Sequence, residues 1–268
     1  MKPIITAFLC CAAGILSADS LAKKYEMEQK VYQEESGKKL LFCSRKMNWD
    51  QPGKAAVLLF FHGAGERGND NEKQLVHGAR EIVQWCTENK QKVLLIFPQC
   101  PNGQQWVDTP WGAPEHKLTQ ESEAMKLVFG LLKETLKEQD IDPGRVYVSG
   151  ISMGGFGTWD AISRCPELFA AAFPVCGGAD TAMAERLKDL PILVYHGDSD
   201  TVVLTKRSRD IAAAIKAVGG TKIKYVEVPN CGHGSWGPAF ADNNNWKWLF
   251  EQKRDTSFWG KIRKFFSF

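Results

Sequence analysis

The chain has 268 residues, of which 44% are hydrophobic and 24% charged, a composition typical of a soluble globular protein. Its 34 basic and 31 acidic residues leave a formal net charge of +3 and are spread along the sequence. No basic patch of the kind that binds nucleic acid stands out, so we expect no nucleic-acid partner.

The N-terminal segment, residues 1–22, has the pattern of a secretory signal peptide. Lys2 precedes an apolar run over residues 4–16, and small and polar residues follow as far as Ala22. The run is shorter than the roughly 20 residues that span a bilayer. We therefore expect export, either to the periplasm or out of the cell, and a catalytic domain over residues 23–254. A buried helix of the fold is the alternative.

Short apolar runs alternate with longer amphipathic segments after residue 25, a pattern typical of an α/β fold. Residues 25–32 and 39–43 are half-polar and predict an antiparallel hairpin at a sheet edge. More apolar runs, bounded by Gly, Pro or Asn, predict buried central strands. These central runs are residues 55–61, 93–97, 146–149, 169–175, 192–195 and 223–228. Together they indicate a mostly parallel sheet with helices on both faces.

One long helix is predicted between the second and third central strands. Apolar residues recur there at spacings of three and four from Ala124 to Leu136, and Thr119 with Glu121 and Glu123 provides a start. Further helices are predicted over residues 75–86, 205–217 and 239–250.

The carboxyl ends of parallel strands meet at one edge of a sheet, so catalytic residues are expected directly after strands. Gly150-Ile151-Ser152-Met153-Gly154 follows such a strand and begins a helix, as the G-x-S-x-G nucleophile elbow does. We therefore predict Ser152 as the nucleophile. The alternative is a serine N-cap followed by glycines that permit close packing.

A serine nucleophile needs a base, and the base needs a carboxylate to orient it. His233 lies in a glycine-rich loop after the last strand and is the predicted base. Asp200 follows the preceding strand and is the predicted acid, ahead of Asp198 and then Asp180. We expect the other four histidines to be structural (His62 and His196) or solvated (His77 and His116).

Two backbone amides should stabilise a tetrahedral intermediate. We predict the amides of Met153 and Ala64 for this oxyanion hole, with Gly63 as the second choice to Ala64. The loop over residues 62–68 lacks the Lys-Ser/Thr pair of a phosphate-binding loop. Within it, we expect Glu66 and Arg67 to pair with each other or with the hairpin, ahead of a contact with substrate.

These motifs resemble the α/β-hydrolase serine esterases that include feruloyl and acetylxylan esterases, and more loosely the dienelactone hydrolases. The resemblance rests on residues 62–68, on Pro98-Gln99-Cys100-Pro101 with Trp106, and on residues 150–154, 196–200 and 232–236. It implies hydrolysis of carboxylic esters through an acyl-enzyme without a cofactor. Two alternatives stay open: a serine peptidase of the prolyl-oligopeptidase type, and a hydrolase-fold binding module without catalysis.

Substrate contacts are predicted for Trp106 and Trp236, because a flat aromatic ring can stack on a sugar or phenolic group. Trp111 is a further candidate. For each of the three, a place in the hydrophobic core is an equal alternative. No long lid segment separates the strands near Ser149 and Phe169. Short or exposed acyl groups are therefore favoured, and the expected partner is an ester substrate, with carbohydrate linkage open.

Six cysteines remain after the signal peptide, an even number that an oxidising compartment can pair, although small buried unpaired residues fit equally. They show no zinc-like spacing, so we expect no metal site. The C-terminal tail, residues 255–268, interleaves aromatic and basic residues, which is typical of weak membrane contact and equally of docking on the body. Oligomeric state, and the acyl and alcohol specificity, stay open.

Overall fold

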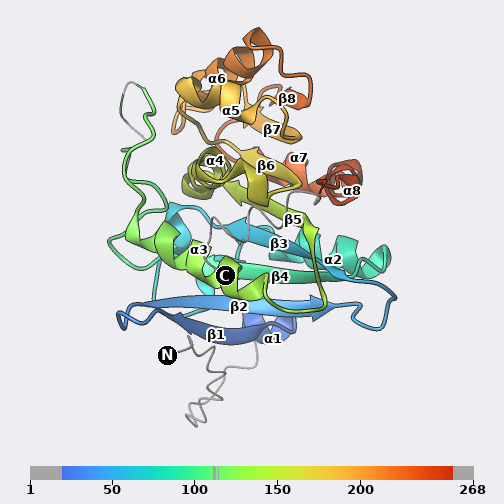
Figure 1. The fold of residues 1–268 in the computed structure, drawn as a ribbon. Coiled ribbons are helices and arrows are strands. Elements are labelled where there is room, and N and C mark those ends of the chain that lie inside the picture. The colour runs from blue at the N-terminus through green and yellow to red at the C-terminus, as the bar shows by residue number, and fades with distance from the viewer. Residues whose placement is uncertain (1–19, 111–112, 114, 256–268) are drawn as a thin grey trace.

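The computed structural model describes residues 20–110, 113 and 115–255. Most of the expected signal peptide, Trp111 and the tail beyond Asp255 therefore lie outside the described residues. The described chain forms an eight-stranded sheet (Figure 1). Its strands are β1 (Glu28–Gln33), β2 (Lys39–Met47), β3 (Ala55–Phe61), β4 (Val93–Gln99), β5 (Ile141–Ile151), β6 (Ala171–Val175), β7 (Ile192–Gly197) and β8 (Ile223–Val228).

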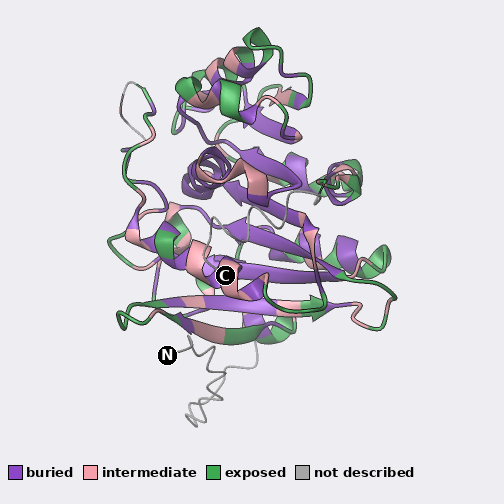
Figure 2. Ribbon diagram, in the orientation of Figure 1, coloured by how far each residue is buried: buried purple, intermediate pink, exposed green. Residues whose placement is uncertain are grey.

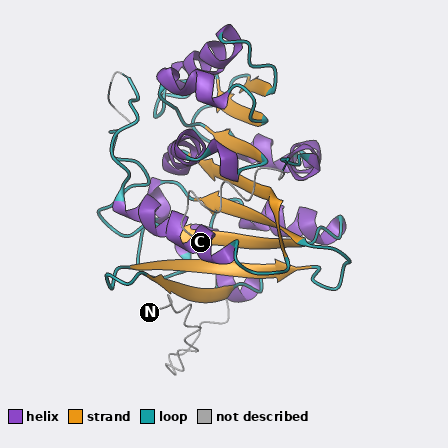
Figure 3. Cartoon of the chain, in the orientation of Figure 1, coloured by secondary structure: helices purple, strands orange, loops and turns teal. Residues whose placement is uncertain are grey.

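The strand order is β1-β2-β4-β3-β5-β6-β7-β8, so the hairpin formed by the first two strands lies at one edge. β1 and β2 pair antiparallel, with Val31 opposite Leu41, and β2 also runs antiparallel to β4. From β4 to β8 every pairing is parallel. This arrangement confirms the predicted α/β-hydrolase architecture with its N-terminal edge hairpin (Figure 3).

Helices cover both faces of the sheet, and each layer has its own apolar core (Figures 1 and 2). One layer contains α3 (Glu123–Thr135), α4 (Met153–Arg164), α5 (Ala184–Leu187) and α6 (Lys206–Ala217). The other contains α1 (Leu21–Lys24), α2 (Ala79–Glu88), α7 (Trp236–Ala241) and α8 (Asn243–Glu251). Short 3-10 turns lie at Ala64–Glu66, Lys73–Leu75, Pro166–Leu168 and Thr181–Met183.

Strand β3 shows why its residues form a central strand. Its seven residues are all buried, and successive side chains alternate between the two cores. Val57, Leu59 and Phe61 enter the α3–α6 core, while Ala56, Leu58 and Phe60 enter the other. Each fully buried large side chain stabilises the fold by about 1.5–3 kcal/mol relative to exposure. A strand buried on both faces is continuously apolar, as the sequence is here.

Three helix predictions differ from the structure in their boundaries. The helix predicted over residues 75–86 begins only at Ala79, because Gly78, with a φ of 82°, separates it from the preceding 3-10 turn. The long helix begins after Ser122, whose Oγ accepts the amide proton of Met125 at 3.1 Å, rather than at Thr119. The helix predicted over residues 239–250 is two helices, because Asp242 is extended between them and its side chain caps α8 through the amide of Asn244.

The last three residues of the predicted signal peptide lie in the described part and pack on the body. Ser20 Oγ caps α1, and the Ala22 amide donates to Glu72 Oε1 at 3.0 Å. Ala22 itself is buried. Cleavage after Ala22 would remove these contacts. No helix among the described residues is long and apolar enough to cross a membrane.

All six described cysteines are unpaired. Four of them are buried, and Cys165 and Cys231 are half-buried. The structure therefore favours the role of small apolar side chains over that of disulfide partners.

Candidate active site

Ser152 occupies a strained turn between β5 and α4. Its φ of 54° and ψ of −119° lie outside the regions that side chains normally adopt. A Cβ on Gly154 would overlap the carbonyl oxygen of Phe61, and one on Gly150 would overlap that of Gly154. The glycines of the motif are thus required by close backbone approach. The Ser152 side chain makes no N-cap hydrogen bond, so its hydroxyl is left for another partner.

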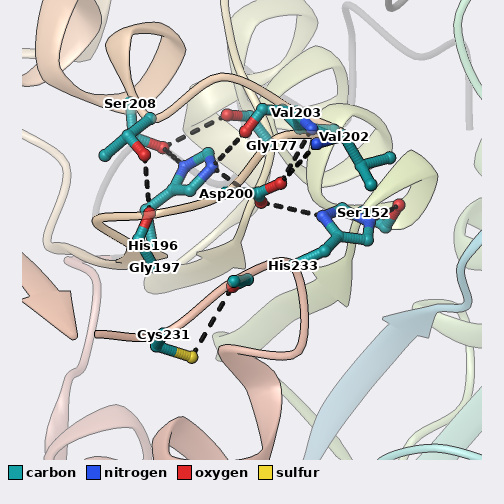
Figure 4. A network of polar contacts seen from close by, with 12 residues as sticks. Ser152, Gly177, His196, Gly197, Asp200, Val202, Val203, Ser208, Cys231 and His233 are labelled. Carbon is teal, nitrogen blue, oxygen red and sulfur yellow. Dashed lines mark hydrogen bonds and ion pairs between the residues drawn. The ribbon is translucent and has the colours of Figure 1, made fainter. Parts of the chain in front are cut away.

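That partner is His233, from the loop between β8 and α7 (Figure 4). His233 Nε2 lies 2.8 Å from Ser152 Oγ, and its Nδ1 lies 2.8 Å from Asp200 Oδ2. An ionised carboxylate only accepts, so the proton of the neutral ring belongs on Nδ1, and Nε2 is free to accept the serine proton. The structure therefore brings together the three side chains predicted from sequence.

Asp200 is held rigidly at the end of β7. Its Oδ1 accepts the amide protons of Val202 and Val203, each at 2.9 Å. Burial alone would raise the pKa of the Asp200 carboxyl, but hydrogen bonds from His196 and His233 and from these amides hold it well below its usual range. The carboxylate therefore stays ionised beside the His233 ring.

The alternative acids have other roles. Asp198 is exposed and accepts the hydroxyl proton of Ser199, and Asp180 caps a 3-10 turn through the amide of Ala182. Neither carboxylate is hydrogen-bonded to His233.

The loops after β7 and β8 lie in close contact beside Ser152, His233 and Asp200. The Ser199 amide donates to the Cys231 carbonyl at 3.0 Å, and a Cβ on Gly197 would overlap the same carbonyl. This contact fixes the loop that carries Asp200 against the loop that carries His233.

A family model described as phospholipase/carboxylesterase matches residues 48–246, which include all three of these side chains. The chain belongs to this family. It is therefore a carboxylesterase-family hydrolase of the α/β-hydrolase fold.

Two relatives and one solved structure illustrate the similarity. A bifunctional acetylxylan esterase/xylanase of Neocallimastix patriciarum is 31% identical over 68% of this chain and 26% of its own length. An uncharacterized secreted protein of Arthroderma benhamiae is 25% identical over 74% of this chain and 23% of its own. The chain thus spans about a quarter of each relative. The crystal structure of a thermostable esterase, 35% identical, superposes with a TM-score of 0.77 over 85% of this chain and 63% of that one.

A small cavity opens beside Ser152 in this carboxylesterase-family chain. Its volume is about 100 Å³, and it is lined by Ser152 with Ala64, Met153, Phe156, Val202 and Val203. Met153 is the first residue of α4, so its amide has no acceptor within its own helix. Ala64 begins the 3-10 turn after β3. Both predicted oxyanion-hole residues therefore line the cavity at Ser152.

The loop that carries Ala64 is braced by His62. The Cys100 amide donates to His62 Nε2 at 2.9 Å, which places the ring proton on Nδ1, beside the Gly63 carbonyl. Burial lowers the pKa of His62 to about 4, so this imidazole is neutral near pH 7. The structural role predicted for His62 is confirmed.

The predicted substrate contact of Trp106 is wrong. Its indole is fully buried, packs 4.8 Å from the Phe61 ring, and donates from Nε1 to the His62 carbonyl at 3.1 Å. Trp106 therefore supports the loop from inside the core and has no surface for a substrate.

Trp236 is half-buried and lies beside His233, with the two ring centroids 5.5 Å apart. Among the histidines predicted to be solvated, His77 is partly exposed, but His116 is only 6% exposed and packs against Phe156. The prediction for His116 is therefore wrong.

Among the described residues, one group of side chains offers ligand atoms close enough for a metal ion: Cys176, Asp200 and His233, within 4.8 Å of one another. Burial raises the pKa of the Cys176 thiol, which opposes the thiolate form that metals bind. Asp200 and His233 already hydrogen-bond to each other. The group fits a hydrogen-bonded triad better than a metal centre.

Sequence reasoning missed the residues that shape the cavity. Phe156 lies one helical turn after Ser152, and Val202 and Val203 follow Asp200 after one intervening residue, Thr201. An apolar pair two and three residues after the candidate acid was the available signal.

Proposed function

We propose that this protein is a serine carboxylic-ester hydrolase that acts through an acyl-enzyme, with Ser152 as nucleophile, His233 as general base and Asp200 as the orienting acid. The observation that carries the proposal is the position of the His233 ring, 2.8 Å from Ser152 Oγ on one side and 2.8 Å from the Asp200 carboxylate on the other. Such an arrangement suits proton transfer in acyl transfer reactions.

In the first step, Ser152 Oγ forms a bond to the acyl carbon while its proton passes to His233 Nε2. The carbonyl oxygen becomes an anion, which the amides of Met153 and Ala64 stabilise. When the ester C–O bond breaks, the leaving alkoxide takes the proton from His233. Water then attacks the acyl-enzyme by the same route in reverse, which releases the acid and restores Ser152. Asp200 stabilises the imidazolium in both steps.

The cavity beside Ser152 supports a short acyl group. Its volume of about 100 Å³ is well below the roughly 300 Å³ at which pockets for drug-sized ligands begin. Ala64, Met153, Phe156 and the two valines line it, so it favours a small apolar group. These features favour acetyl over feruloyl esters.

Two further parts of the proposal concern the alcohol and the place of action. The similarity to an acetylxylan esterase supports an acetylated polysaccharide as substrate. The leader pattern in residues 1–22 and the similarity to a secreted protein support export. We propose that the enzyme acts outside the cytoplasm.

The experiment compares the parent enzyme with Ser152→Ala on p-nitrophenyl acetate, acetylated xylan, methyl ferulate and a peptidyl amide. We expect acetyl esters to be cleaved fastest and the alanine variant to lose activity by about 10⁴-fold or more. Ser199→Ala is the matched control, because the exposed hydroxyl that it removes donates only to the neighbouring Asp198, and the backbone contact of Ser199 is kept.

Each alternative outcome has a clear meaning. Full activity in Ser152→Ala would remove the nucleophile from the proposal. Faster cleavage of the peptidyl amide would identify a peptidase, and inactivity of the parent on every substrate would identify a binding module.

A further inference from the structure

A second group of side chains lies beside Ser152 and His233, and the mechanism above does not use these side chains. It consists of Glu66, His77 and Trp236. The Trp236 ring lies between two histidine rings, 5.5 Å from His233 and 5.4 Å from His77. His77 Nε2 in turn lies 3.9 Å from Glu66 Oε1. We call these three residues the alcohol-side group.

Glu66 also approaches the nucleophile. A Cβ built on Gly63 would lie 3.0 Å from Glu66 Oε2 and 3.6 Å from Ser152 Cβ. The alcohol-side group therefore begins at the base and ends beside Ser152. None of its members lines the small acyl cavity.

The Glu66 carboxylate lacks a hydrogen-bond donor within the described residues. Oε2 is buried without a partner, and Oε1 is too far from His77 for a hydrogen bond. The Glu66 side chain is only 13% exposed, so bulk water compensates little. A buried acceptor without a donor is rare in native proteins. Its position near Ser152 leaves it available to a donor from a bound ligand.

The predicted pairing of Glu66 with Arg67 is not found. Arg67 Nε donates to the Ala64 carbonyl at 2.9 Å, and a terminal nitrogen donates to the Gln104 carbonyl at 3.3 Å. The guanidinium is therefore used to hold the loop, and the carboxylate faces the other way, toward His77.

The leaving alcohol must lie beside His233, because His233 Nε2 protonates the departing oxygen. The acyl group fills the cavity bounded by Phe156 and the valines, so the alcohol extends to another side of Ser152. The alcohol-side group provides a partly exposed indole and histidine there, with an unpaired carboxylate. An aromatic surface beside a hydrogen-bond acceptor suits a sugar ring with free hydroxyls.

We infer that Glu66, with His77 and Trp236, forms a subsite for a polyhydroxylated alcohol, in which a hydroxyl next to the ester donates to the Glu66 carboxylate. This inference rests on the proposed ester hydrolysis and makes Glu66 a specificity-determining residue. Because the acceptor is an anion, the subsite selects neutral hydroxyl donors and disfavours anionic alcohols.

The test uses two acetyl esters of one sugar and one simple aryl ester. Methyl 2-O-acetyl-xylopyranoside has free neighbouring hydroxyls, the fully acetylated methyl xyloside has none, and p-nitrophenyl acetate has no sugar. We measure kcat/KM for each with the parent, Glu66→Ala, Glu66→Gln and His77→Asn. Glu115→Ala is the matched control, since this exposed carboxylate lines a different cavity with Leu204 and Arg207.

We expect Glu66→Ala to lower kcat/KM on the monoacetylated sugar by about tenfold, as for a lost hydrogen bond to a charged acceptor. Glu66→Gln should fall between this variant and the parent. Hydrolysis of p-nitrophenyl acetate and of the fully acetylated sugar should change by less than about twofold, and Glu115→Ala should change none of the three. Melting temperatures check that each variant is folded.

Two outcomes overturn the inference. Equal losses on all three substrates would make Glu66 a support of the oxyanion loop, and unchanged rates on all three would make it a bystander. Failure of the proposed function is distinguishable, because the parent would then cleave none of the esters or Ser152→Ala would retain its rate.

Discussion

His196 Nε2 lies 3.2 Å from Asp200 Oδ2, the same oxygen that faces His233 (Figure 4). The His196 ring is fully buried and also contacts the Val203 carbonyl at 2.8 Å through Nε2. A carbonyl only accepts, so Nε2 carries the proton and shares it between the two oxygens. Asp200 therefore has an imidazole on each side. We interpret His196 as a positioning residue that holds the carboxylate in the plane His233 requires.

Replacing His196 with phenylalanine should preserve the volume and remove both ring nitrogens. We expect kcat to fall by about tenfold with KM little changed, because a hydrogen bond to a charged group is lost. The pKa of Asp200 should rise toward its usual value. The acidic limb of the plot of kcat against pH should then move to higher pH. Ser208→Ala, which removes the 2.7 Å contact at His196 Nδ1, is the milder control. A parent-like kcat and pH profile in His196→Phe would contradict the positioning role.

Stability should decrease in mild acid because of buried neutral histidines. Burial, followed by the charge of Arg207, lowers the pKa of His116 to about 4, below the ordinary value of 6.5. Between these two values the unfolded chain binds more protons than the folded one. The contribution of His116 to the free energy of unfolding is therefore complete above pH 6.5 and is lost as the pH falls toward 4. Its full size is about 3 kcal/mol.

Denaturant unfolding of the parent and His116→Gln from pH 4 to 7.5 measures this effect. The variant should show a shallower dependence of the unfolding free energy on pH in this range, although His62, whose pKa is also lowered to about 4, keeps part of the slope. Equal slopes in the two proteins would show that His116 does not titrate as its burial requires.

The fold and the three triad positions were accessible from sequence for a local reason. Each catalytic candidate lies within five residues after the end of a strand, and strand ends are marked by short-range pattern alone. The side chains whose environment was predicted wrongly depend on distant partners. Trp106 is buried because Gly157, on α4, leaves room for it: a Cβ there would lie 2.8 Å from Trp106 Cβ. His116 is buried by Phe156, forty residues away in the chain. Such contacts leave no signal near either residue.

The close backbone approach behind Ser152 predicts that Gly154→Ala destabilises the fold strongly. The added Cβ would overlap the carbonyl oxygen of Phe61, and the backbone is fixed on both sides, by the first turn of α4 at Gly154 and by β3 at Phe61. We expect a loss of about 3 kcal/mol or more in the unfolding free energy, at the upper end for overpacking. Gly237→Ala is the matched control, because an added Cβ in α7 would meet no atom within 4 Å outside its chain neighbours. Its effect should stay within about 1 kcal/mol, because Pro238 offsets the gain in helix propensity. Thermal unfolding of both variants distinguishes a large loss of stability from a small change.

The cavity lined by Phe156 should set the length of the acyl chain. Leucine at this position leaves more room beside Ser152, and each additional buried methylene contributes about 0.8 kcal/mol. Phe156→Leu should therefore raise the butyrate-to-acetate ratio of kcat/KM, measured with p-nitrophenyl esters, by about tenfold. Phe173→Leu is the matched control, because Phe173 is equally buried but lies in the opposite core, away from the cavity. A similar shift of this ratio in both variants would show that looser packing of the core is the cause. A shift in Phe156→Leu alone would show that the Phe156 side chain selects the acyl group.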